Sequence, residues 1–192
     1  MPLKDGNLLW FIQQHQNQTD MFRTPTEADQ AGQLLFNQIL GQMLSALDYL
    51  ESQAVVHRYI CPSNILVKTG SSDGGNHSFY LSNFEYANFT GIGFEPSNVC
   101  SRAPEESGLT DAQVLPQTDI WGLCATMAYV FDLPGFRELV SNRPSATDLA
   151  HAVCEKSRML VSLRGMGEWD AGDRPSAGQK LVELFSEAGG RG

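Results

Sequence analysis

Lysine is scarce in this sequence. Only four of the 192 residues are lysines, and the 13 lysines and arginines together face 22 acidic residues, giving a formal net charge of −9. A surface of this sign repels the phosphates of nucleic acids and anionic lipids, and the basic residues are too scattered to form a local patch. We therefore expect neither nucleic acid nor a membrane as a partner.

Long apolar runs and metal-binding cysteine patterns are also missing. The apolar run at residues 8–12 is too short for a signal peptide, and no stretch approaches the ~20 apolar residues of a membrane span. The four cysteines lie far apart, outside any CxxC or Cys/His pattern: Cys61, Cys100, Cys124 and Cys154. Free thiols are favoured over disulfides, so we expect an intracellular protein, cytoplasmic or nuclear.

The composition is that of a globular protein. Hydrophobic residues make up 42% of the chain and charged residues 18%, and the length suits one domain. We expect a single domain over residues 1–188, followed by a flexible tail at residues 189–192.

Helices dominate the predicted secondary structure. Thr24, with a proline after it and Glu27 three positions on, predicts a capped helix start, and the apolar stripe that follows carries this helix to about Ser52. Residues 118–131 are apolar on every side, which predicts a buried central helix. Two or three further helices follow, capped near Thr147 and Ser176.

Short β segments interrupt the helices. Residues 54–56, 65–67 and 79–81 have strand character, and the last two are separated by a polar, glycine-rich stretch at residues 69–77. This arrangement predicts a hairpin with a long loop. The fold class is therefore mainly α with a small β-hairpin.

Five motifs occur in an order typical of one family. They are H-R-Y-I-C-P-S-N at residues 57–64, N-F-E at 83–85, A-P-E at 103–105, D-I-W-G-L at 119–123 and D-R-P-S-A at 173–177. Together they resemble the C-terminal lobe of the eukaryotic-type protein kinases, whose corresponding signatures include H-R-D-x-K-x-x-N, D-F-G and A-P-E. Each motif is weak alone, but their order and spacing make the resemblance specific.

The departures from this family fall on the residues that carry the chemistry. The resemblance places Tyr59 where the family has its catalytic aspartate, and a phenol with a pKa near ~10 cannot replace that carboxylate. Cys61 replaces the catalytic-loop lysine, Asn83 the metal-binding aspartate, and Glu85 the glycine of D-F-G. Only Asn64, the family's second metal ligand, is kept. We expect no catalytic residues and no metal site.

The family's N-terminal lobe has no counterpart in this sequence. No glycine-rich G-x-G-x-x-G and no lysine-bearing V-A-I-K strand precede the residue 57–64 motif. We therefore expect a C-lobe with the N-lobe absent. ATP would meet half a pocket, with Leu66 as a vestigial lining residue, so little or no binding of ATP or Mg²⁺ is expected.

The resemblance implies that structural positions are better kept. His57 would stack on Phe84, Asp119 would hydrogen-bond the backbone of the catalytic loop, and Glu105 would form a buried ion pair with Arg174. His57 is therefore interpreted as a core histidine in preference to a catalytic one.

Four residues keep two interpretations each. Arg58 either has a structural role or, as the resemblance implies, binds a phosphorylated Thr90, Ser97 or Ser101. Cys61 could be a reactive thiol, although no basic neighbour clearly lowers its pKa. Trp10 and Phe11 would ordinarily be core residues, but lie near the surface that an upper lobe would cover, which makes them candidate interface residues.

The sequence thus predicts a catalytically inactive, pseudokinase-type interaction or scaffold module. Its partner would be another protein, or a second copy of itself, bound through the exposed upper face. The alternative is a divergent Ser/Thr protein kinase, an ATP-dependent phosphotransferase whose N-lobe lies outside this chain. A degenerate product without a selected role is a third possibility.

Overall fold

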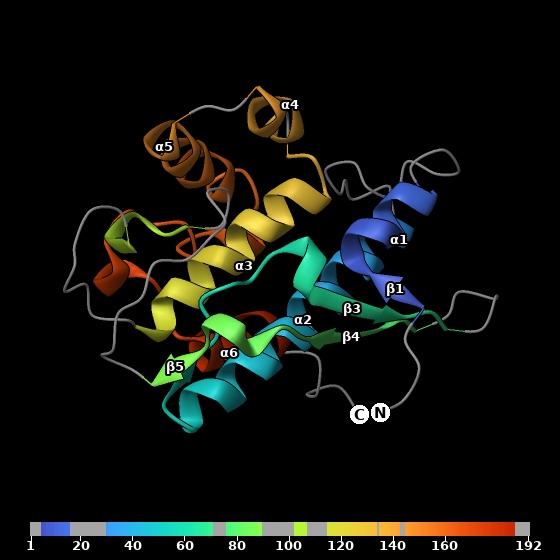
Figure 1. Cartoon of the computed structure of the whole chain (residues 1–192), viewed down its shortest axis with the longest axis horizontal. Coiled ribbons are helices and arrows are strands. Elements are labelled where there is room, and N and C mark those ends of the chain that lie inside the picture. The colour runs from blue at the N-terminus through green and yellow to red at the C-terminus, as the bar shows by residue number, and fades with distance from the viewer. Residues whose placement is uncertain are drawn as a thin grey trace.

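The computed structural model is mostly helical, with two small sheets (Figure 1). It describes residues 5–15, 30–70, 76–89, 102–106, 115–133, 135–142 and 145–186. Its α-helices are α1 (Leu8–His15), α2 (Gln30–Ser52), α3 (Pro116–Val130), α4 (Phe136–Ser141), α5 (Ala146–Ser157) and α6 (Ala177–Phe185). Within these ranges, none of the helices has the length and apolar character needed to cross a bilayer.

In the part of the chain that the structure describes, five short strands form the sheets: β1 (Gly6–Asn7), β2 (Val55–Val56), β3 (Ile65–Lys68), β4 (Ser78–Leu81) and β5 (Asn88–Phe89). The first sheet has the order β1-β3-β4, with β3 and β4 antiparallel and Leu66 opposite Tyr80. The predicted hairpin is therefore confirmed. The β2 strand instead pairs with β5, with Val55 opposite Phe89.

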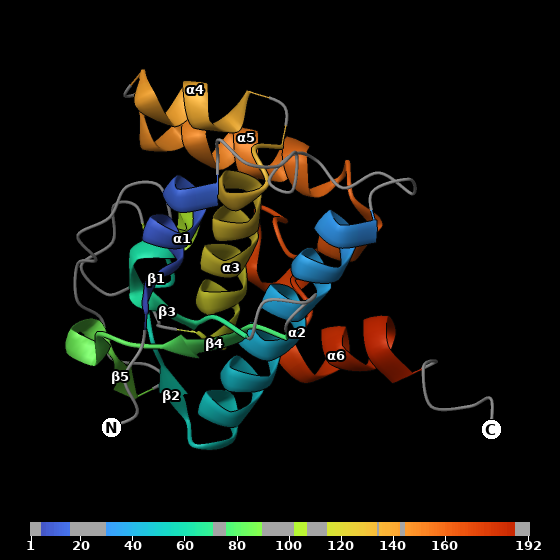
Figure 2. The same cartoon turned by 90° about the vertical axis from the view of Figure 1, so that its right-hand side faces the viewer.

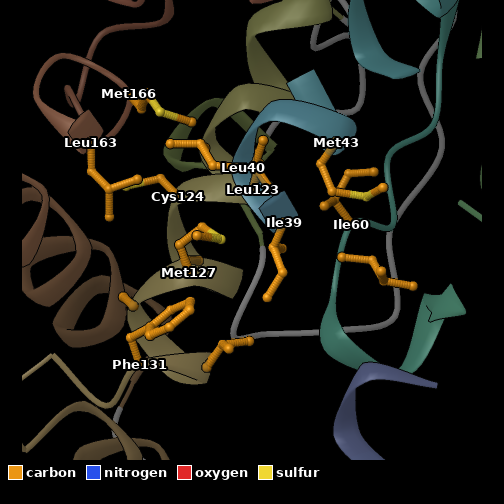
Figure 3. Packing of buried hydrophobic residues seen from close by; sticks show 14 of the residues in the cluster. Ile39, Leu40, Met43, Ile60, Leu123, Cys124, Met127, Phe131, Leu163 and Met166 are labelled. Carbon is orange, nitrogen blue, oxygen red and sulfur yellow. The ribbon is translucent and has the colours of Figure 1, made fainter. Parts of the chain in front are cut away.

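Helix α3 runs through the centre of the molecule (Figures 1 and 2). From Thr118 to Ala128 every side chain is buried, as the run of apolar residues predicts. Figure 3 shows Leu123 and Met127 of α3 packing with Ile39 and Met43 of α2 and with Ile60. The core thus joins α2 to the loop at residues 57–64.

The two last α-helices begin at serine caps. Ser176 caps α6 as predicted, and its side chain accepts a hydrogen bond from the Gln179 amide in a capping box. The N-cap of α5 is Ser145, which forms a capping box with Asp148. This cap lies two residues before the expected position near Thr147. The predicted start at Thr24 and the tail at residues 189–192 lie outside the described residues, whereas α2 ends at Ser52 as expected.

A glutamine side chain of α2 hydrogen-bonds the backbone at the open edge of β4. Gln42 accepts a hydrogen bond from the Phe79 amide at 2.9 Å and donates one to the His77 carbonyl at 3.0 Å. These bonds satisfy backbone groups that a sheet edge leaves open, and they fix the hairpin on the helix. The hairpin in turn positions the residues that follow Leu81.

Candidate functional site

The residue 57–64 loop is tied to the start of α3 by Asp119. Its carboxylate accepts the backbone N–H of His57 at 2.6 Å and that of Arg58 at 2.7 Å. Arg58 has a φ of 65°, a conformation that non-glycine residues adopt only when their surroundings hold it. Burial raises the pKa of Asp119 to about 7, while the two backbone donors act in the opposite direction. Asp119 therefore has a structural task at this site.

His57 lies fully buried between the loop and the segment after β4. Its Nδ1 accepts the Tyr59 N–H at 3.3 Å, so the ring proton is on Nε2, which faces the Ser82 carbonyl at 3.0 Å. The Phe84 ring packs edge-on against the imidazole, with 4.6 Å between centroids. Burial lowers the pKa of His57, which keeps the ring neutral. These contacts favour the structural interpretation of this histidine.

The side chains of Tyr59 and Asn83 both contact neighbouring residues of this site. The Tyr59 ring is half-buried and meets the Tyr86 ring edge-on, 5.2 Å between centroids and 86° between planes. Asn83 has a φ of 61° and donates from Nδ2 to Asn64 Oδ1 at 3.3 Å, while Asn64 Nδ2 donates to the Tyr59 carbonyl at 2.9 Å. The two asparagines that the resemblance places at metal-ligand positions thus contact each other.

The donors at these positions differ from those that ordinarily hold magnesium and a nucleoside triphosphate. Mg²⁺ is ordinarily held through one or two carboxylates together with phosphate oxygens, and here Asn64 and Asn83 are neutral amides, one oxygen of which already accepts a hydrogen bond. Glu85 is exposed on the 3₁₀-helix Phe84–Tyr86, Cys61 is buried, and Leu66 is half-buried in β3. Across the described ranges, no three His, Cys, Asp or Glu residues are grouped to hold a metal ion.

Glu105 and Arg174 form the ion pair that the resemblance implies. Nη1 and Nη2 of Arg174 donate to the two carboxylate oxygens of Glu105, at 2.7 and 2.8 Å. The Arg174 side chain has no exposed area, whereas that of Glu105 is 20% exposed. The pair joins the 3₁₀-helix Pro104–Glu106 to the residues that precede α6.

A second buried pair lies beside it. Arg58 Nη2 is 3.6 Å from Glu106 Oε1, and both side chains are almost fully buried. Burial raises the pKa of Glu106 to about 7, and the nearby Arg58 guanidinium offsets only part of this shift. Arg58 thus contacts an acidic side chain of this chain, and Thr90, Ser97 and Ser101, its proposed phosphorylated partners, lie outside the described residues.

The structure corrects the interface expectation for Phe11. This side chain is 1% exposed, since α1 turns it into the core, where its ring meets His77 edge-on at 5.0 Å. Trp10 is 37% exposed and lies against Gly6 of β1, where an added Cβ would clash with the indole. Of the two aromatic residues, Trp10 alone remains a candidate for an interface.

Cysteine chemistry contributes little at this site. Cys124 is a buried free thiol and Cys154 a half-buried one; Cys61 is buried, and Cys100 lies outside the described residues. Burial raises the pKa of Cys124 to about 12, so this thiol is inert at neutral pH. Free thiols at Cys124 and Cys154 agree with the pattern read from the sequence.

Comparison with known families assigns the chain. The family model described as protein tyrosine and serine/threonine kinase matches residues 2–159, more than half of the sequence. The chain belongs to the protein kinase family. No curated protein matches it significantly. The D-R-P-S-A motif at residues 173–177 lies beyond the matched region, but Arg174 connects it to the matched part through Glu105.

Sequence reasoning missed several residues of this site. Tyr86 and Ser82 contact the loop, Glu106 neighbours Arg58, and Lys180 is fully buried with its ammonium 2.9 Å from the Glu183 carboxylate and the Arg164 carbonyl. The spacing of Lys180 and Glu183, three residues apart on a helix, was a signal for that pair. No comparable signal marks Tyr86, whose role depends on how residues 82–89 return to the loop.

Proposed function

We propose that this chain is a catalytically inactive, pseudokinase-type module that acts by binding protein and not by transferring phosphate. The observation that carries the proposal is the state of the two asparagines. Asn83 donates to Asn64, and neither a carboxylate nor a lysine stands at the positions where the family holds metal and phosphate. Tyr59, at the position of the family's general base, packs on Tyr86 instead.

The proposed partner is another protein or a second copy of this chain. A surface with the net charge of −9 disfavours nucleic acid and anionic membranes. Trp10, partly exposed beside β1, is the aromatic side chain that we assign to the binding surface. Tryptophan is enriched among residues that dominate interface energies, which supports this choice.

Thermal unfolding with and without ATP tests the proposal. The full chain is melted in three buffers, which contain Mg²⁺, Mn²⁺ or EDTA. In each buffer we expect the Tm with nucleotide to equal the Tm without it. A ligand at ~100 times its Kd would add about 2.7 kcal/mol and raise Tm by roughly 5–10 °C. Asn83→Asp is the matched variant, because it places a carboxylate beside Asn64. A metal-dependent rise in Tm for that variant alone would support the proposal.

The competing function is phosphoryl transfer by a divergent kinase completed by an N-lobe outside this chain. Transfer of the γ-phosphate of ATP to a protein substrate by the unaltered chain would establish this alternative and overturn our proposal. A metal-dependent Tm rise in the unaltered chain would show that it binds nucleotide and would favour the alternative. The same assay on Tyr59→Ala would then show whether the phenol takes part.

A further inference from the structure

The segment that follows β4 is fastened to the residue 57–64 loop by backbone and amide hydrogen bonds. The Ser82 amide and hydroxyl both donate to the Asn64 carbonyl, each at 2.9 Å. Asn83 then donates to the Asn64 side chain, and its left-handed backbone turns the chain into the 3₁₀-helix Phe84–Tyr86. Asn64 therefore accepts hydrogen bonds from this segment with both its backbone carbonyl and its side-chain oxygen.

Two aromatic contacts continue the attachment. Residues 57 and 59 of the loop meet residues 84 and 86 of the segment: His57 packs edge-on with Phe84, and Tyr59 packs edge-on with Tyr86. Edge-to-face pairs at these centroid separations stabilise the contact beyond the area that they bury. An aspartate at residue 59 would offer no ring to Tyr86, so this contact depends on the residue that replaces the family's catalytic carboxylate.

The far end of the segment is also fixed. The β5 strand pairs with β2, which immediately precedes His57, and the Ala87 amide donates to the Phe84 carbonyl at 3.1 Å. Residues 82–89 are thus attached at both ends, with the tyrosine pair between. Phe84 and Phe89 remain 48% and 63% exposed on this attached segment.

We infer that Tyr59 and Tyr86, together with the hydrogen bond from the Asn83 side-chain amide to the Asn64 side-chain oxygen, form a latch that holds residues 82–89 against the loop in one conformation. The inference rests on the proposed function, because it gives residues at the former chemical positions a structural task. A closed latch displays Phe84 and Phe89 in fixed positions while it occupies the amide oxygen that a metal would need.

Hydrogen exchange of the full chain, without nucleotide, tests the latch. The reporters are the backbone amides of residues 87–89, and amides of α3 report global unfolding. Removing one tyrosine ring should speed reporter exchange about two- to tenfold, relative to the α3 amides, in both Tyr59→Ala and Tyr86→Ala. Because the rings act on each other, the double variant should exchange no faster than the faster single variant.

Two further variants make the result specific. Tyr59→Phe keeps the edge contact and should retain the wild-type exchange rate, and Tyr49→Ala removes a tyrosine that is 65% exposed on α2 and should leave the reporters unchanged. Unchanged reporters in Tyr86→Ala, multiplicative effects in the double variant, or loss of protection in Tyr59→Phe would each overturn the latch. None of these outcomes depends on ATP binding, so the latch can fail while the proposed function stands.

Discussion

Removing the Arg174 side chain should destabilise this protein more than removing any exposed arginine. The guanidinium makes five hydrogen bonds: two to the Glu105 carboxylate and three to the backbone carbonyls of Glu168, Gln117 and Trp169. It also lies over the Trp121 ring, 4.9 Å from the centroid. Arg174→Ala therefore leaves a half-buried carboxylate and three carbonyls without their donor.

The expected cost follows from burial. Breaking a buried ion pair by removing one partner costs ~3–5 kcal/mol. Glu105 would recover some hydration, because its side chain is 20% exposed, and it would keep the Thr118 hydroxyl as a donor at 3.0 Å. We therefore expect about 3 kcal/mol less stability, a fall in Tm on the order of 10 °C for a chain of this size.

Urea unfolding followed by circular dichroism measures this loss, and Arg158→Ala is the matched control. Arg158 pairs with Glu168 at 3.5 Å, but its side chain is 65% exposed, so the loss there should stay under ~1 kcal/mol. A double-mutant cycle with Glu105→Gln should give a coupling of at least ~1 kcal/mol. If Arg174→Ala and Arg158→Ala destabilise the protein equally, the structural role assigned to the buried pair is wrong.

The other predictions concern Glu106, Ser176 and Leu123. Glu106→Gln should gain stability relative to the wild type as pH rises from 4.5 to 7, because the folded wild type keeps a proton on Glu106 that the unfolded chain releases. At ~1.4 kcal/mol per pKa unit, the gain between urea titrations at pH 5 and pH 7.5 is about 2 kcal/mol, and a pH-independent difference would contradict it. Ser176→Ala should cost ~1 kcal/mol of unfolding free energy through loss of the α6 cap, whereas Ser141→Ala, outside any cap, should cost less. Leu123→Ala should cost ~2–5 kcal/mol, and Val182→Ala, 65% exposed, almost nothing; equal losses would place Leu123 outside the core.

The sequence was most informative where periodicity and caps dominate. The buried run of α3, the hairpin of β3 and β4, and the Ser176 cap follow from local patterns that the fold leaves intact. It was least informative where a side chain's surroundings come from distant residues. Phe11 illustrates this limit, because an aromatic residue near the N-terminus becomes core only once α1 packs beside β3 and His77.

In the candidate site, too, some residues were predictable from local sequence and others were not. Motif order located Asp119, Glu105 and Arg174, because each belongs to a signature with a fixed spacing. Motif order could not reveal the partner of Tyr59, since a substitution shows which chemistry is lost and not which contact is gained. The Tyr59–Tyr86 pair and the Asn64–Asn83 bond depend on the left-handed turn at Asn83, which only the three-dimensional path of the chain makes visible.

Asp119 is an aspartate that holds the backbone of the residue 57–64 loop. Its two carboxylate oxygens each receive a different backbone N–H, and an asparagine would turn an amide donor toward one of them. The loop has a residue in a left-handed conformation at Arg58, so both bonds are needed to hold it in place. Loss of Asp119 would therefore affect the folding of this loop directly.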